Sequence, residues 1–458
     1  MKYSDEILGK EKMWKLVLSM TIPCIFAQIV NLLYSIIDRI YIGNMEGVGK
    51  LALAGIGLCT PIITFIAAFS GFISGGGAPL ASRALGENKR DIAHKYLGNG
   101  TFLLIIFTFT LSIFSYIFKK PLLYFIGASE NTFNYANDYL SIYLLGTLFV
   151  QISVGLNTFI TAQGRSRLAM MSTLIGAITN IILDPIFIFL FHLEVKGAAL
   201  ATVISQGISA IFVLVILTNK NSSIRLTFSN LKPDISIIGN IIKLGVAQFV
   251  MAATESVIGF ALNGQLKRYG GDLHVSNLAI LQSCMMLITT PMTGFTQGVT
   301  PILSYNFGLK NTSRIKDCFT KTLLVCFSYA SLLALIMIIF PYPFARMFTS
   351  DKELIKLTMT YLPIFISGML IFGIQRACQT TFVSMGEALI SLFIAILRKI
   401  LLLVPFSFIF PTLPFFGGVK GVYIAECVAD VMSATICFTI FIIRFRAIMK
   451  KTEACHID

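Results

Sequence analysis

Twelve long apolar segments run through the sequence and restrict its fold more than any other feature. Each is long enough to cross a bilayer, which takes about 20 residues of α-helix. Only 13% of the residues are charged, about half the share usual in soluble domains. The sequence therefore predicts an all-α polytopic membrane protein whose twelve transmembrane helices lie at residues 16–42, 53–80, 97–118, 136–160, 168–190, 197–217, 237–262, 277–303, 318–340, 357–382, 388–410 and 419–443.

The basic residues predict the orientation of the chain. Of the 36 Lys and Arg, 22 lie at the two termini and the even-numbered loops, whereas 11 lie at the odd-numbered loops. Loops rich in Lys and Arg stay in the cytoplasm. We therefore expect both termini to be cytoplasmic. The net charge of +14 then reflects topology, and no nucleic-acid partner is expected.

The second half of the sequence repeats the first. When the sequence is aligned with itself at a shift of 222 residues, identical residues fall in register. Toward the end of the repeat the shift becomes 224, and residues 197–210 then align with residues 421–434. The pairs at the shift of 222 are Gly76/Gly298, Pro79/Pro301, Ser82/Ser304, Gly86/Gly308, Tyr139/Tyr361, Gly146/Gly368 and Gly164/Gly386.

Each half contains six apolar segments, an even number, so both halves have the same orientation. This predicts a parallel repeat about an axis along the membrane normal, an arrangement typical of alternating-access transporters. We expect an N-lobe at residues 1–217, a cytoplasmic connecting loop at 218–240 and a C-lobe at 241–458. Duplication that served assembly alone is the alternative.

The stretch "NIILDP", residues 180–185, places a carboxylate inside an apolar segment. A charge at membrane depth costs about 2.5–3.5 kcal/mol on insertion scales, so it normally faces protein or water. Helix rise places Asp38, Asp184 and Thr202 at a similar depth, about 8–10 Å below the outer face. Asn180 shares a helix face with Asp184, and Pro185 leaves a backbone carbonyl without its helical donor. These oxygens predict a Na⁺ or H⁺ site; a purely structural hydrogen bond from Asp184 is the alternative.

The second half has a different set of polar residues. Two acids, Glu426 and Asp430, lie four residues apart in the last apolar segment, and two bases, Arg398 and Lys399, lie in the segment before it. These four residues predict a structural charge cluster. Met and aromatic side chains suit flat organic cations, although lipid-facing residues have the same composition. The candidates for a substrate cavity are Glu255, Gln282, Met286, Gln375 and Arg376, with Glu255 equally plausible as a coupling carboxylate.

Motifs for enzymatic chemistry are missing from the sequence. The four histidines lie at predicted loops or the tail, and no P-loop, GxSxG, HExxH or CxxC pattern occurs. We therefore expect no enzyme activity, no cofactor and no metal beyond a coupling Na⁺.

Three motifs resemble the multidrug and toxic compound extrusion (MATE) family, in particular its bacterial MepA-like branch. They are "PLASRALGENK" after the second apolar segment, "PILSYNFGLKN" after the eighth, and "NIILDPIFIF" followed by "KGAALAT". The resemblance covers about residues 12–445. It implies a monomer in the bacterial cell membrane that exports amphipathic organic cations against inward Na⁺ or H⁺, by alternating access of two six-helix lobes.

The resemblance also implies a coupling-ion site in the N-lobe, at Asp38, Asn180, Asp184 and Thr202, with Tyr139 close by. Some family members have a C-lobe acid pair as well; Glu255 matches the first acid, but Gln375 and Arg376 stand where the second would be. The alternatives are a flippase for lipid-linked saccharides in the same fold and, from other classes, an integral-membrane enzyme or a non-transporting scaffold.

Overall fold

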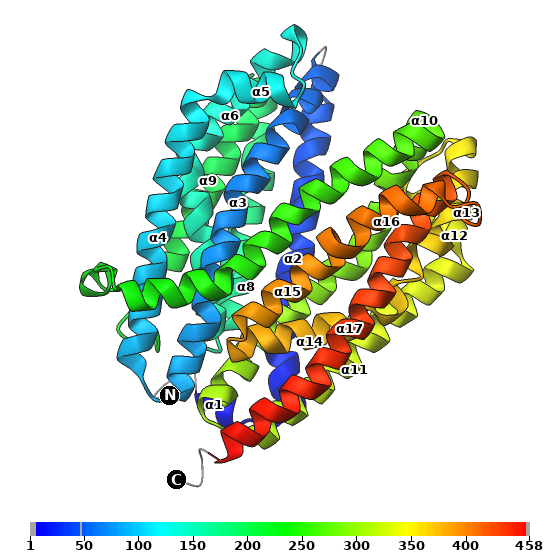
Figure 1. Ribbon diagram of the computed structural model, residues 1–458. Helices are drawn as coiled ribbons and strands as arrows, with labels where there is room; N and C mark the ends of the chain where they lie inside the picture. Colours follow the sequence, from blue (N-terminus) through cyan, green and yellow to red (C-terminus); the bar gives the residue numbers. More distant parts are fainter. Residues whose placement is uncertain (1–5, 46–47, 455–458) are drawn as a thin grey trace. The chain divides into compact units, whose positions relative to one another are not determined.

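The computed structural model describes residues 6–45 and 48–454, apart from the side chains of residues 50, 255–257 and 260. The chain forms two compact units, Met1–Gly245 and Val246–Asp458, and each is described by itself (Figure 1). The described residues form helices joined by short turns. Helices are the structure that an apolar chain adopts in lipid, because they satisfy every backbone donor and acceptor within one segment.

The first unit consists of nine α-helices, the start of a tenth and three short irregular helices. They are α1 (Glu6–Lys10), α2 (Met13–Gly43), α3 (Gly49–Gly86), α4 (Arg90–Ile117), α5 (Lys119–Ile126), α6 (Glu130–Gln151), η1 (Ile152–Leu156), α7 (Asn157–Ala162), α8 (Ser166–Pro185), η2 (Ile186–Leu190), α9 (Glu194–Thr218), η3 (Phe228–Leu231) and the beginning of α10 (Ile235–Gly308).

The second unit contains the rest of α10 and the helices that follow it. These are α11 (Thr312–Ile339), α12 (Pro341–Phe348), α13 (Lys352–Ile366), α14 (Met369–Met385), α15 (Ala388–Ile396), η4 (Leu397–Leu403), α16 (Val404–Ile409), η5 (Phe410–Thr412) and α17 (Val419–Ala454).

The number of membrane-spanning helices agrees with the sequence analysis. Within the described residues, eleven helices are long and apolar enough to span, and α13 with α14, bent by 44° at their junction, makes a twelfth. The all-α polytopic fold class is thereby confirmed. One boundary differs: residues 263–276, expected to form a loop, are helical except for a reversal at Gly271, whose φ is 73°. No proline interrupts this stretch, and glycine is the residue that adopts a positive φ without strain.

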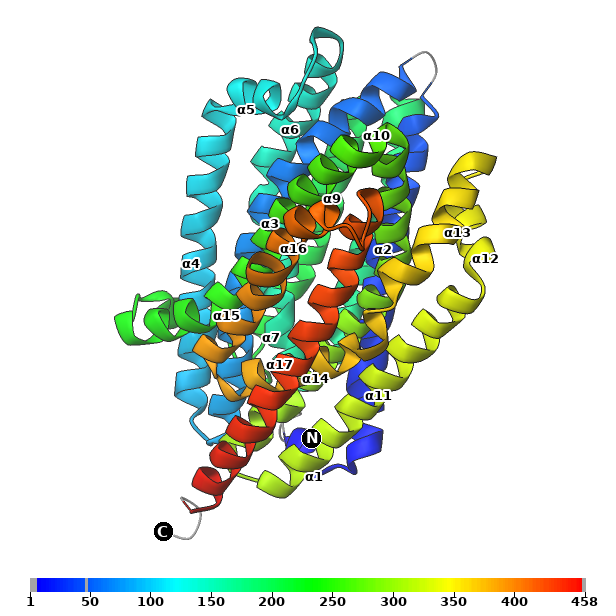
Figure 2. The ribbon, with the colours of Figure 1, turned by 45° about the vertical axis from the view of Figure 1, so that its right-hand side comes forward.

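Small residues let neighbouring helices approach closely within each unit. In the first unit, α2 packs along α8, α8 along α9, and α9 along α6; the last pair can be followed in Figures 1 and 2. A Cβ on Gly146 would lie 2.3 Å from a methyl group of Val203. At the repeat-related Gly368 a Cβ would lie 2.6 Å from the Cβ of Asp430. The shared glycine therefore marks the same close helix crossing in both halves.

The segment that leads into α10 is anchored on α4. Its Asp234 carboxylate accepts the N–H groups of Ser236 and Ile237 and pairs with Lys95 at 3.4 Å. The backbone N–H of Asp234 donates to Asn99 Oδ1 at 2.7 Å. The N–H of Ile237, together with Lys95 and Ser236, lowers the pKa of Asp234. The expected connecting loop, 218–240, thus includes the first turns of α10, held by this cap.

The crossing of α6 and α9 gives a test of the packing. Gly146→Ala forces the added methyl group against Val203, whose β-branched side chain is fixed in a helix, and is expected to lower the free energy of unfolding by about 1–3 kcal/mol. Gly57, on α3, has open space around its Cβ position, so Gly57→Ala is expected to be neutral or stabilising by about 0.5–1 kcal/mol. Thermal unfolding in detergent measures both. Equal effects of the two substitutions would contradict the close packing.

Candidate functional site

Four polar side chains from three helices meet inside the first unit. Asp38 lies near the end of α2, Asn180 and Asp184 lie one turn apart on α8, and Thr202 lies on α9. The Asn180 Nδ2 donates to Asp184 Oδ1 at 3.3 Å and, in a longer contact, to Thr202 Oγ1 at 3.5 Å. The carboxyl groups of Asp38 and Asp184 lie within direct interaction range of each other. The four residues that depth and helix spacing singled out therefore form one cluster.

This cluster is buried and has unused acceptors. Asp184 is 0% exposed, Asn180 1% and Asp38 9%. Within the described part of the chain, no hydrogen-bond donor reaches Asp38 Oδ1, Asn180 Oδ1 or Asp184 Oδ2, all of which are buried. Buried polar atoms are nearly always paired, and an unpaired one costs free energy. Three oxygens from two helices are thus free to bind a cation, a proton or water.

Two tyrosines border the cluster. Tyr139, on α6, is buried, lies close to Thr202 and stacks on Tyr143. Tyr34 lies one turn before Asp38 on α2, close to both carboxyl groups. The sequence analysis included Tyr139 but missed Tyr34, whose signal was its four-residue spacing from Asp38.

Pro185 shapes the helix that carries two of these residues. A proline has no N–H to donate to the preceding turn, and α8 passes directly into the π-helical turn η2 after it. Short π-helical segments are often found at functional sites. The proline that follows Asp184 therefore marks a change in helix geometry beside the carboxylates.

The ligand set is poor for transition metals. Among the residues that the structure describes, no three His, Cys, Asp or Glu side chains converge on one point. Two carboxylates with an amide oxygen and a hydroxyl are hard oxygen donors. Such a set fits an alkali cation or a shared proton.

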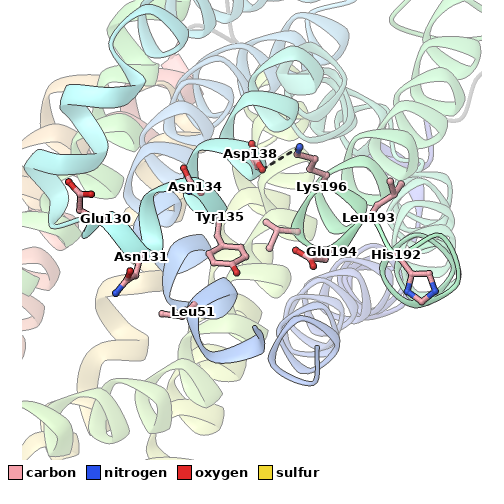
Figure 3. Close-up of a pocket in the computed structure, with 11 residues that line it drawn as sticks. Leu51, Glu130, Asn131, Asn134, Tyr135, Asp138, His192, Leu193, Glu194 and Lys196 are labelled. Carbon is pink, nitrogen blue, oxygen red and sulfur yellow. Dashed lines mark ion pairs between the residues drawn. The ribbon is translucent and has the colours of Figure 1, made fainter. Parts of the chain in front are cut away.

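A separate cavity of about 630 Å³ opens at the ends of α3, α6 and α9, at the end of the first unit that also holds α5 (Figures 1 and 3). Asp138 and Lys196 form an ion pair across it at 3.4 Å. Its lining residues are Leu51, Glu130, Asn131, Asn134, Tyr135, Asp138, His192, Leu193, Glu194, Val195 and Lys196.

This cavity lies close to the polar cluster along the chain. Tyr135 lines it, and Tyr139 follows one turn further along α6, about 6 Å by helix rise. Between the cavity and Thr202, however, α9 carries the fully buried Ala198 and Ala199. Apolar packing therefore lies between the cavity and the carboxylates.

In the second unit, three of the four expected cluster residues come together. The Arg398 Nε donates to Asp430 Oδ1 at 2.5 Å, and its Nη2 donates to Glu426 Oε1 at 3.3 Å. Lys399, the next residue along the chain, donates to the backbone carbonyl of Met251 at 3.3 Å.

The residues suggested for a substrate cavity do not share one environment. Gln375 is buried and accepts a hydrogen bond from Ser433, while Arg376 donates to Thr293 Oγ1 at 3.1 Å. Gln282 is half-buried, and Met286 is 50% exposed. The side chain of Glu255 lies outside the described residues.

Comparisons with known proteins support the family resemblance. The chain is 24% identical over 450 residues to the "Multidrug export protein MepA" of Staphylococcus haemolyticus (strain JCSC1435), covering 98% of each chain. It is also 24% identical over 451 residues to the protein of that name from Staphylococcus aureus (strain MSSA476), covering 97% of each.

Solved structures share the fold. One, described as "Crystal structure of MATE in the bent conformation", is 22% identical, with a TM-score of 0.92 over 98% of this chain and 99% of the other. Another, an "Outward-facing conformation of a multidrug resistance MATE family transporter of the MOP superfamily", is 22% identical, with a TM-score of 0.88 over 97% and 98% of the two chains. The MatE family model matches residues 23–186 and 248–409. The chain belongs to the MatE family, which consists of transporters and not of enzymes.

Proposed function

We propose that this protein is a secondary-active multidrug exporter, which moves amphipathic organic cations out of the cell against an inward flow of Na⁺ or H⁺. The printed names of its relatives support multidrug export as the activity. The distribution of Lys and Arg supports cytoplasmic termini. In that orientation the Asp38–Asp184 cluster lies toward the outer face of the membrane.

One observation carries the coupling mechanism: the three unpartnered oxygens of Asp38, Asn180 and Asp184. Two carboxylates close together in a low-dielectric interior repel each other, and a bound cation or a shared proton removes that repulsion. Hard oxygen ligands suit Na⁺, and a buried carboxyl pair equally carries a proton. The cluster is therefore the coupling site, with Thr202 and Tyr139 completing its wall.

Antiport follows from the position of this site between moving helices. A cation that pairs Asp38 with Asp184 joins α2 to α8 and favours the conformation in which they are close. The organic substrate must favour the opposite conformation, so that each ligand lowers the affinity for the other. The inward gradient of the coupling ion then drives substrate release to the outside.

Stability separates this role from a structural one. Asp184→Asn removes a buried carboxylate that has no ion-pair partner among the described residues. In a Na⁺-poor buffer at pH 8, the variant is therefore expected to unfold at the wild-type temperature or above it. Asp430→Asn breaks a buried ion pair and is expected to cost about 3–5 kcal/mol. Thermal unfolding in detergent compares the two. If Asp184→Asn lowered the stability of the protein as much as Asp430→Asn does, Asp184 would have a structural role in holding the helices together.

Transport tests the proposal directly. In proteoliposomes loaded with ethidium, efflux is expected to accelerate under an imposed Na⁺ gradient, a pH gradient, or both, and the response identifies the ion. Asp38→Asn and Asp184→Asn are each expected to reduce gradient-driven efflux at least tenfold, about 1.4 kcal/mol or more in coupling. Asp138→Asn, which alters the ion pair with Lys196, is the matched control and is expected to retain driven efflux.

Two results would contradict the proposal. Undiminished gradient-driven efflux in both aspartate variants would remove the coupling site from Asp38 and Asp184. Absence of ethidium efflux from the wild-type protein under either gradient would exclude organic-cation antiport and favour the lipid-linked saccharide alternative.

A further inference from the structure

The second unit contains a buried cation box, which we define as Glu426 and Asp430 on α17 with Phe372 on α14. The box holds the guanidinium of Arg398, bound to Asp430 at 2.5 Å and Glu426 at 3.3 Å. The centre of that guanidinium lies 4.6 Å from the centroid of the Phe372 ring. The side chains of Glu426 and Asp430 are 4% and 1% exposed, while that of Arg398 is 12% exposed.

The box recognises one kind of ion. Two carboxylates bind the edge of a planar, delocalised cation through charge-assisted hydrogen bonds. An aromatic ring attracts a cation placed over its face. Both contacts are made to the flat guanidinium of Arg398, which has the shape and charge of the cationic end of a planar organic cation. The guanidinium of Arg398 thus indicates what kind of ligand the box can bind, namely a planar cation.

The internal repeat gives this box a counterpart in the first unit. At the offset of 224, Glu426 falls on Thr202 and Asp430 on Gln206. Thr202 borders the proposed coupling site of the first unit, whereas Glu426, at the corresponding position of the second unit, binds a cation that the chain itself supplies.

Arg398 is suited to leave the box. It lies in the π-helical segment η4 (Leu397–Leu403), and such segments mark irregular, often functional, stretches of helix. The guanidinium of Arg376 is close enough to repel it. An incoming planar cation that takes its place leaves the charge of the box unchanged, so neither acid is left buried and unpaired.

We propose that Glu426, Asp430 and Phe372 form a binding site for planar organic cations, in which Arg398 is a tethered competitor that the substrate displaces. The inference rests on the proposed export function, since it assigns the exported cation to a site. Between transport cycles Arg398 returns to the acids. A guanidinium fixed on the chain thereby keeps the box occupied without blocking it permanently.

Competition gives the proposal a measurable consequence. The apparent affinity of a site equals its intrinsic affinity multiplied by the fraction of time that the site is free of the competitor. A competitor that is present 90% of the time therefore weakens binding tenfold. Arg398→Gln is therefore expected to bind ethidium about tenfold more tightly than wild type, or tighter still. Fluorescence anisotropy on the purified full-length protein measures the dissociation constant. Arg398→Gln with Asp430→Asn is expected to lose this gain.

Arg346→Gln is the matched control, because Arg346 lies on α12, donates to the Tyr342 hydroxyl and lies outside the box. It is expected to leave ethidium affinity within about threefold of wild type. Thermal unfolding and size-exclusion chromatography verify that each variant is folded. A folded Arg398→Gln protein whose ethidium affinity is unchanged or weaker would overturn the proposal and leave the three charges a purely structural cluster.

A measurement on the wild-type protein keeps the test decisive where Arg398→Gln does not fold. Phenylglyoxal reacts with accessible guanidinium groups, and peptide mass spectrometry locates the modified arginines. Saturating ethidium is expected to accelerate modification of Arg398 severalfold and to leave the modification of Arg346 unchanged. An unchanged or slower reaction of Arg398 would contradict displacement.

These binding measurements stand apart from the transport test. Loss of gradient-driven efflux, with ethidium still displacing Arg398, would refute coupled export and retain the cation site. Normal efflux with no response at Arg398 would refute the cation site and retain the proposed export function.

Discussion

A carboxylate buried in a membrane protein must be balanced by a positive charge, a proton or hydrogen bonds, and the polar interior of this chain is organised by that constraint. Among the side chains that the structure describes, each unit buries two acids on its helices: Asp38 and Asp184 in the first, Glu426 and Asp430 in the second. The second unit supplies its own cation, Arg398. The first unit leaves carboxylate and amide oxygens without a donor from the described residues. Where the protein does not balance the negative charge of a buried site itself, an ion from solution can bind there and control it.

The packing of the repeat brings the same two helices together in each half of the chain. Gly146 and Gly368 allow the fourth helix of each repeat to lie against the sixth. Side chains on the facing turns are then excluded from lipid, which is where charged groups at membrane depth are tolerated. Duplication preserved this crossing while the residues beside it diverged, so that Thr202 stands in one half and Glu426 in the other. The same helix crossing thereby carries different polar residues in the two halves.

Most of the architecture could be predicted from hydropathy, because length and apolarity determine membrane helices directly. The grouping of Asp38, Asn180, Asp184 and Thr202 could be predicted as well, since helix rise fixes depth and four-residue spacing fixes a face. The contact of Lys399 with the Met251 carbonyl could not be predicted, because it joins residues 148 positions apart. The helical continuation through residues 263–276 could not be predicted either. The polar composition of this stretch predicted a loop, but a single glycine, Gly271, suffices to reverse the chain. Tyr34 was missed although it lies four residues before Asp38, because that spacing alone does not distinguish it from the other aromatic residues of an apolar helix.

The central claim is that the Asp38–Asp184 cluster binds the coupling ion in competition with the exported cation, and linkage tests it most directly. Ethidium affinity of the purified protein is measured as Na⁺ concentration and pH are varied, for the wild type and for Asp184→Asn. Wild-type affinity is expected to fall at least fivefold, about 1 kcal/mol, as Na⁺ or proton concentration rises, and Asp184→Asn is expected to abolish the dependence. The same dependence in both proteins, or none in the wild type, would contradict this claim.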